Sequence, residues 1–446
     1  MITLLCVSVS MFAFTTPVKN LTAGKLASTL NPNSYYSVTD LEIQAGTIDA
    51  SDFKTMRDKL TNLQTVTISN KVAIVAYSGL DGTSSSRDSY LANVVPQGAF
   101  KGKTTLRSIT LPSSVTGYGA SAFNGCTNLG DITISSKATF IDASAFKGCT
   151  KLASVTIPAT VTSIGASAFS GCTGLLTVDN SSSITEFEDF TFYNCTQLTS
   201  ITMPSTLKTL GQQVFRRCLA LKNVDLTNVT TINPGCFENC SSLSSVTFNP
   251  SVSVIPVYAF DSCKSLTSVV FPASVTTVES FAFQGCSSLQ TLTIPSTIST
   301  INKYAFGYCI SLKDIYVSRA TPLYIGLNGV FEGVNNTVVS CTLHVPAGSA
   351  KDYRLESGWR SLNIVEEQAS EIKQSSSDNS KLKISVVKGS LLLTNLEAGQ
   401  LISVYTVQGQ LITQATVNAS TLSLGLPSKG IYVLRVGANS YKLLNY

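Results

Sequence analysis

A repeat of 23 residues constrains this chain more than any other feature of its sequence. Nine of the twelve cysteines follow one another at steps of 23 residues, apart from a single step of 22. Each follows a Phe by three positions and precedes a Leu by three positions, so one unit reads A-F-x-x-C-x-x-L-x-x-I-T-I-P-x-x-V-x-x-I-x-x-x. The nine are Cys126, Cys149, Cys172, Cys195, Cys218, Cys240, Cys263, Cys286 and Cys309. A unit this short cannot bury its own apolar face, so the pattern predicts units stacked into a solenoid.

The I-T-I part of the unit predicts one strand in each coil. Its apolar and polar residues alternate, as in a strand with one buried face, and a proline such as Pro158 or Pro295 often ends it. Strand centres from residue 42 to residue 344 predict 13 coils joined by a parallel sheet. At roughly 4.8 Å per strand, the array would be about 60 Å long. An excess of about 20 residues between residues 67 and 110 predicts a surface loop inserted into one coil.

The sequence divides into six parts. An apolar stretch suggests a secretory leader over residues 1–22, which is followed by an N-terminal cap and first coil over 23–60. In that cap we expect short helices over residues 23–30 and 52–60, the second with Asp52 as its N-cap. The solenoid follows over 61–345, and a C-terminal cap over 346–365. A polar linker over 366–380 precedes six short alternating segments, which predict an antiparallel β-sandwich over 381–446.

Composition excludes several classes of function. The net charge of +5 is too weak and too scattered for a nucleic-acid binder. The single histidine, His344, rules out mechanisms or metal sites that need two imidazoles, and we expect it to be a solvated residue of the last strand. Apart from the leader, no apolar run is long enough for a membrane-spanning helix. We therefore expect no catalytic residue, no metal and no cofactor.

Two chemical clusters have plainer interpretations. The repeating cysteines could suggest disulfides or a metal site, but residues stacked once per coil have parallel Cβ vectors and lack the C-x₂₋₄-C pairs of zinc sites. We predict that they are small buried apolar residues, and that Cys236 replaces the usual Ala. Glu186, Glu188 and Asp189 could bind a cation, but they lack the pattern of a calcium loop and are predicted to form a solvated turn.

The repeat unit resembles the BspA-type, or Treponema pallidum-type, leucine-rich repeat over about residues 40–365. The resemblance implies a right-handed leucine-rich-repeat solenoid and a bacterial surface or secreted protein, typically a binding or adhesion protein without catalysis. The last part of the chain resembles the C-terminal sorting domain of the type IX secretion system of Bacteroidetes, through the segments 404–410 and 424–436. This second resemblance implies export to the cell surface or the medium, with association with the outer membrane.

The outward positions of the predicted strands are the best candidate for a binding site. Solenoids present such a row on a concave face, where a partner can lie across several coils. We expect the partner to be a host matrix or surface protein, or a bacterial surface glycan. Two alternatives stay open: a cell-envelope spacer without a ligand, because Thr is simply a good strand residue, and a carbohydrate-active enzyme using carboxylates of the row. The row comprises Thr110, Thr133, Thr156, Asp179, Thr202, Asp225, Thr247, Val270, Thr293 and Tyr316.

Overall fold

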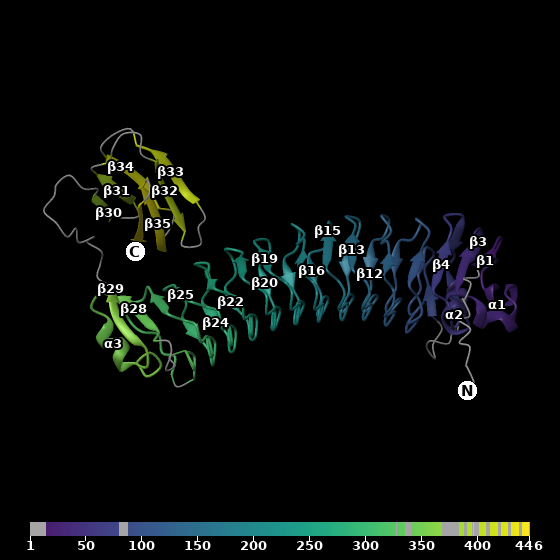
Figure 1. The fold of residues 1–446 in the computed structure, drawn as a ribbon, viewed down its shortest axis with the longest axis horizontal. Coiled ribbons are helices and arrows are strands. Elements are labelled where there is room, and N and C mark those ends of the chain that lie inside the picture. Colours follow the sequence, from purple (N-terminus) through teal and green to yellow (C-terminus); the bar gives the residue numbers. More distant parts are fainter. Residues whose placement is uncertain are drawn as a thin grey trace, which may run out of the picture. The chain divides into compact units, whose positions relative to one another are not determined.

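A computed structural model shows two compact units (Figure 1). The structure describes residues 15–79, 88–326, 328–334, 340–367, 383–387, 390–394, 396, 401–406, 411–417, 421–426, 430–436 and 439–445. Unit 1 comprises Met1–Tyr316, Leu323–Thr342 and Glu356–Asn363, and unit 2 comprises Val317–Pro322, Leu343–Leu355 and Ile364–Tyr446. Most of the predicted leader, the tip of the inserted loop and nearly all of the predicted linker lie outside the described residues.

Unit 1 is a stack of coils, each of which adds one strand to a parallel array. These strands are β1 (Thr15–Val18), β2 (Asp40–Ile43), β4 (Thr65–Ile68), β9 (Ser108–Thr110), β11 (Asp131–Ile132), β13 (Ser154–Ile157), β15 (Thr177–Asn180), β17 (Ser200–Ile201), β19 (Asn223–Leu226), β21 (Ser245–Phe248), β23 (Ser268–Val269), β25 (Thr291–Ile294) and β27 (Asp314–Val317). Equivalent repeat positions pair, as Val155 does with Val178. The pair Asp225 and Thr247 keeps this register across the 22-residue step, so the missing residue lies outside the strand.

The parallel leucine-rich-repeat solenoid with its period of about 23 residues is therefore confirmed, but the count of 13 coils is too low. The solenoid has about 15 turns. The strands that the count missed are β1 and β29 (Asn363–Glu367), which lie in segments without the Phe and Cys motif. Strand β1 pairs with β2, so residues 15–18, which we assigned to the leader, belong to the first coil.

A second strand in most coils was not predicted. These strands are β3 (Gly46–Ile48), β5 (Val72–Ile74), β8 (Val94–Val95), β10 (Gly117–Tyr118), β12 (Phe140–Ile141), β14 (Ser163–Ile164), β16 (Glu186–Phe187), β18 (Thr209–Leu210), β20 (Thr231–Ile232), β22 (Val254–Ile255), β24 (Thr277–Val278) and β26 (Thr300–Ile301). Most contain only two residues, too few for an alternating pattern. The inserted loop contains one hairpin, β6 (Tyr77–Gly79) and β7 (Asp88–Tyr90).

Two columns of repeated side chains fill the interior of unit 1. The Phe rings stack from Phe100 to Phe331, with centroids 5.2–5.8 Å apart and planes within 12° of parallel. Each cysteine of the 23-residue series donates its Sγ–H to the backbone carbonyl of the Phe in the preceding coil, at 3.1–3.3 Å. The predicted burial of the cysteines is confirmed, and the eleven described cysteines are all unbridged.

The N-terminal cap contains three short helical segments, α1 (Leu26–Thr29), η1 (Pro32–Ser37) and α2 (Ala50–Asp58). Our prediction that Asp52 is the N-cap of the second helix is wrong. Asp49 is the N-cap, and Asp52, three residues later, completes a capping box. Asp52 also accepts hydrogen bonds from the backbone N–H groups of Gly24 and Leu26, at 2.8 and 2.9 Å. Its carboxylate therefore ties the start of the chain to α2.

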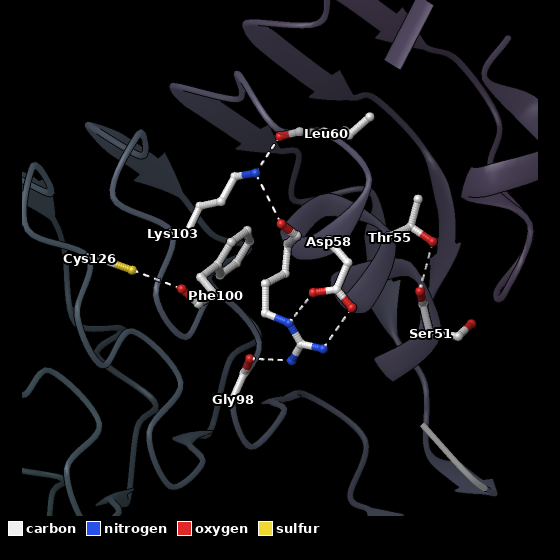
Figure 2. A network of polar contacts seen from close by, with 9 residues as sticks. Ser51, Thr55, Asp58, Leu60, Gly98, Phe100, Lys103 and Cys126 are labelled. Carbon is white, nitrogen blue, oxygen red and sulfur yellow. Dashed lines mark hydrogen bonds and ion pairs between the residues drawn. The ribbon is translucent and has the colours of Figure 1, made fainter. Parts of the chain in front are cut away.

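The cysteine column ends at a lysine beside α2 (Figure 2). Lys103 follows Phe100 by three residues, the position that cysteine occupies in the next nine coils. Its side chain is buried, and its Nζ donates to the carbonyls of Arg57, at 3.0 Å, and of Leu60. These carbonyls lie at the C-terminal end of the helix, where cationic donors are favoured. Lys103 thus joins the repeats to the cap.

Unit 2 contains part of the predicted C-terminal cap and a small β-sandwich. Its first elements are β28 (Thr342–Pro346), α3 (Ala350–Leu355) and β29. The strands of the sandwich are β30 (Lys383–Val387), β31 (Ser390–Thr394), β32 (Leu401–Thr406), β33 (Leu411–Thr416), β34 (Thr421–Gly425), β35 (Gly430–Val436) and β36 (Asn439–Asn445). They form two antiparallel sheets in the orders β30-β31-β34 and β33-β32-β35-β36. Apolar residues of both sheets share one core, as predicted, although β36 was missed.

Candidate functional site

Outward residues in the main strands, or directly after them, form a row along unit 1, which we call the strand-face row. In β13 the buried Val155 and Ile157 flank the exposed Thr156, and the same alternation recurs in β15 and β19. Two of the ten predicted members, Thr293 and Tyr316, are half-buried, and the other eight are exposed. The exposed eight are Thr110, Thr133, Thr156, Asp179, Thr202, Asp225, Thr247 and Val270, of which Thr133, Thr202 and Val270 directly follow β11, β17 and β23.

Strand pairing brings members of this row next to one another. Thr156 is the register partner of Asp179, and Asp225 is the partner of Thr247. Partners in a parallel sheet lie roughly 4.8 Å apart. A ligand lying along the solenoid axis would therefore meet a new side chain of the row at each coil.

The residues that interrupt the threonines differ in their local roles. Asp225 accepts a hydrogen bond from the backbone N–H of Thr227, at 3.0 Å, which helps to end its strand. Val270 is 48% exposed and directly follows the last residue of β23. Asp179 is exposed within β15. Asp is a poor strand residue, so the sheet itself does not favour Asp179.

A second exposed column lies two residues before the strand-face row, and our sequence reasoning missed it. Its members are small and polar, and their side chains point to the same side of the sheet because strand residues alternate. The same alternation in the sequence could have revealed them. The column comprises Asp131, Ser154, Thr177, Ser200, Asn223, Ser245, Ser268 and Thr291. The candidate surface is therefore two residues wide and rich in hydroxyl groups.

Hydrogen bonds link part of this second column from coil to coil. The side-chain oxygen Oδ1 of Asn223 accepts from the hydroxyl of Ser245, at 2.8 Å, and from that of Ser244, at 3.2 Å. The hydroxyls and carboxylates of this surface supply both donors and acceptors, a composition suited to hydrogen bonding with a polar partner.

The other residues that we considered have mainly structural surroundings. Glu188 accepts from the backbone N–H of Ala166, at 2.9 Å, and Asp189 accepts from that of Gln212, at 2.6 Å. These two acids therefore hold backbone turns of neighbouring coils. His344 is half-buried in β28. Among the described residues, no three His, Cys, Asp or Glu side chains are grouped as a metal site would require.

Burial makes the column of thiols chemically inert. It raises the pKa of Cys126 and of Cys172 to about 12, and that of Cys218 well above its ordinary value. Because the thiolate is the reactive and metal-binding form, these side chains are poor nucleophiles and poor ligands in the folded chain. The cysteines therefore belong to the architecture and not to the candidate site.

Comparison with known proteins identifies the repeats. The family profile described as BspA type leucine rich repeat region (6 copies) matches residues 34–153, 139–267 and 230–340, which together span most of the chain. Among curated proteins, none matches the chain. Within the part of the chain that the structure describes, no helix is long and apolar enough to cross a membrane.

Several solved structures are similar to this chain in fold. A leucine rich cell surface protein from Faecalibacterium prausnitzii is 24% identical, with 66% of this chain and 88% of that chain covered and a TM-score of 0.37. A leucine-rich repeat protein from Bacteroides ovatus is 23% identical, with 60% and 82% covered and a TM-score of 0.34. The leucine rich repeat protein of T. pallidum is 25% identical, with 49% and 82% covered and a TM-score of 0.31.

Proposed function

Because the chain belongs to the BspA-type leucine-rich repeat family, we propose that it is an exported, non-catalytic protein that binds a host matrix or surface protein, or a bacterial surface glycan. The observation that carries this proposal is the continuous exposed surface of the main strands. It extends over successive coils, and its hydroxyl columns are interrupted by the aspartates and by the apolar Val270. Val270, directly after β23, gives this polar row an exposed apolar contact point.

The proposed site is the strand-face row with the hydroxyl column beside it. Partners of repeat proteins lie along such surfaces and contact several coils, so affinity is distributed over many modest contacts. Residues that depart from threonine are where specificity would reside. We assign that role to Asp179, Asp225, Val270 and Tyr316.

The experiment is biolayer interferometry of the full chain against host matrix proteins, mucins and bacterial surface glycans. The test variant combines Asp179→Ala, Asp225→Ala and Tyr316→Ala. The control variant combines Glu186→Ala, Asp352→Ala and Tyr324→Ala, which removes exposed residues of the same kinds outside the row.

We expect saturable binding by the wild type and by the control variant, and at least a tenfold loss of affinity in the test variant. Equal binding by all three proteins would refute the proposed site. Absence of binding to every probe would favour a spacer role in the cell envelope.

We further propose that the protein reaches the cell surface or the medium, in association with the outer membrane of a Bacteroidetes-like bacterium. The apolar start of the sequence supports a leader, and the antiparallel sandwich supports a type IX sorting domain. Expression of the full chain in a type IX-competent host, with and without residues 381–446, tests this part. Equal surface or medium fractions for the two forms would refute it.

A further inference from the structure

Five aromatic side chains occupy turn positions where most other coils have small residues: Phe190, whose ring contacts Tyr193, and four that lie in the last coils of the repeat series. Tyr258, Phe281 and Tyr304 each lie two residues before the repeated Phe of their coil, and Tyr308 lies directly before Cys309. Their φ angles are 53–61°, in the left-handed region that bulky side chains rarely adopt. The equivalent residues in three N-terminal coils are Ser121, Ser144 and Ser167 for the first position, and Gly125, Gly148 and Gly171 for the second. The turns therefore form without aromatic residues.

These four side chains contact one another to form a continuous surface, which we call the aromatic shelf. The ring centroids of Tyr258 and Phe281 are 4.9 Å apart, and those of Phe281 and Tyr304 are 5.6 Å apart. Tyr308 lies beside Tyr304 at 6.4 Å, with the two ring planes within 15° of parallel. The shelf thus extends over three successive coils and lies outside the strands of the strand-face row.

Glycines of the following coil make room for the last two rings. A Cβ atom on Gly329 would lie 2.6 Å from Tyr304, and one on Gly333 would lie 2.9 Å from Tyr308. Both distances are shorter than a Cβ atom tolerates. In the preceding coil, Gly285 occupies the position equivalent to Tyr308, so that coil places no side chain at this position next to the Tyr308 ring. The rings are therefore cradled on one side, and Tyr308 remains 47% exposed.

The size of the shelf favours a small ligand over a protein. Tyr258 is 39% exposed, and Tyr308 and the adjoining Ile310 are 47% exposed. With aromatic side chains of roughly 150–250 Å² each, the exposed apolar area of the shelf is about 300–400 Å². A stable protein interface needs about 800 Å² from each partner. The shelf is thus too small for such an interface, and it suits one to three sugar rings.

Polar groups beside the rings complete this chemistry. The ammonium of Lys303 lies 5.2 Å from the ring centroid of Tyr304. Ser262 donates a hydrogen bond to Asp261, at 3.3 Å, in the turn that precedes Gly285. A pyranose has an apolar C–H face, which packs on an aromatic ring, and a rim of hydroxyls, which needs donors and acceptors.

We propose that the aromatic shelf is a binding site for a pyranose-based glycan, separate from the strand-face row. The turns form in other coils without these four rings, and an apolar ring surface beside the ammonium of Lys303 matches the C–H face and the hydroxyl rim of a sugar. The site extends the function beyond the row, and it stands even if the row has no ligand.

The repeat itself supplies well-matched replacements for a test. In one variant, Tyr258→Ser, Phe281→Ser and Tyr304→Ser restore the residue found in three other coils, and Tyr308→Gly is a second variant. The full chain would be tested by saturation-transfer NMR and by binding to immobilised hexasaccharides of glucose, galactose, mannose and N-acetylglucosamine. The row variant with Asp179→Ala, Asp225→Ala and Tyr316→Ala is the control. Circular dichroism checks that each variant is folded.

We expect at least one hexasaccharide to bind, with saturation transfer strongest at the ring C–H protons. Both shelf variants should lose binding by tenfold or more, and the row variant should keep it. Binding that survives in the shelf variants but not in the row variant would overturn the shelf and support the row. Failure of every hexasaccharide to bind would overturn the glycan site.

Discussion

Replacing Lys103 should loosen the N-terminal cap of the solenoid. Lys103→Met keeps the length of the side chain but removes the ammonium donor from the carbonyls of Arg57 and Leu60, of which Leu60 still accepts from the backbone N–H of Leu63 at 3.1 Å. A hydrogen bond to a charged group contributes about 1.5–3 kcal/mol, and relief from burying the ammonium offsets part of the loss of two. We therefore expect the free energy of unfolding to fall by about 2–4 kcal/mol. Lys103→Cys, which restores the repeat motif, should cost about as much, because it too removes the ammonium donor from both carbonyls.

Chemical unfolding followed by circular dichroism measures the loss, and hydrogen exchange of α2 locates it. Lys101→Met is the matched control, because Lys101 is exposed two residues earlier and should change the stability by less than about 0.5 kcal/mol. Exchange should accelerate in α2 and stay unchanged in the coils around Cys218, since repeats contact only their neighbours. Lys103→Met with wild-type stability and unchanged exchange in α2 would refute the role of this lysine.

The same lysine makes stability depend on pH in a defined direction. Burial lowers the pKa of Lys103 from 10.5, and this effect outweighs the attraction of Asp58. Because the unfolded chain then binds the proton more tightly than the folded one, the contribution of Lys103 to stability rises with pH, from the lowered pKa up to about 10.5. Lys103→Met should lack this rise, and an identical pH profile in the variant would contradict the assignment.

Three further predictions concern the interior and one half-buried acid, Asp261. In native protein, a thiol reagent such as DTNB should reach at most Cys6, which lies outside the described residues, whereas in guanidinium all twelve cysteines should react. Phe215→Ala removes a ring stacked 5.6 and 5.4 Å from its neighbours, and it should lower the free energy of unfolding by about 3–5 kcal/mol in a denaturant titration. Burial and the nearby carboxylate of Glu238 raise the pKa of Asp261 from 3.8 to about 6. Its ionisation should therefore lower the thermal-unfolding temperature as pH rises from 4 to 6, and Asp261→Asn should lack this decrease. The same change of unfolding temperature with pH in both proteins would contradict this prediction.

The sequence predicted those features that depend on side-chain periodicity. Alternation placed Thr156 outside and Val155 inside, because a strand with one buried face must alternate. It could not predict β1 or the two-residue strands, because their pairing depends on backbone contacts between coils that a short segment does not encode. The left-handed turn residues were missed for a related reason. Ser121, Arg217 and Tyr258 all adopt a positive φ, so residue type alone does not identify the position.

For the candidate sites too, the sequence pattern predicts some residues, and contacts between neighbouring coils determine the others. Membership of the strand-face row and of the column beside it follows from alternation, but the aromatic shelf depends on equivalent positions lying next to one another in space. The shelf in particular brings together Tyr258, Phe281 and Tyr304, which are 23 residues apart in the sequence. An aromatic residue repeated at this spacing on the surface was the available signal.

A solenoid allows each surface column to be compared with itself, and this comparison separates architecture from function. Inside the stack, a departure such as Cys236 in place of Ala is accommodated, because its Sγ donates to the carbonyl of Gly211 at 3.0 Å. On the surface, Asp179 lies in a strand, where Asp is disfavoured and where other coils have Thr. Tyr258 has a φ angle in the left-handed region, which disfavours a bulky side chain, and three other coils have Ser at that position. The backbone conformation at these positions does not favour the two residues, and the side-chain contact that the structure shows for Tyr258 is its stacking on Phe281. Contact with a partner is our proposal for why they are there.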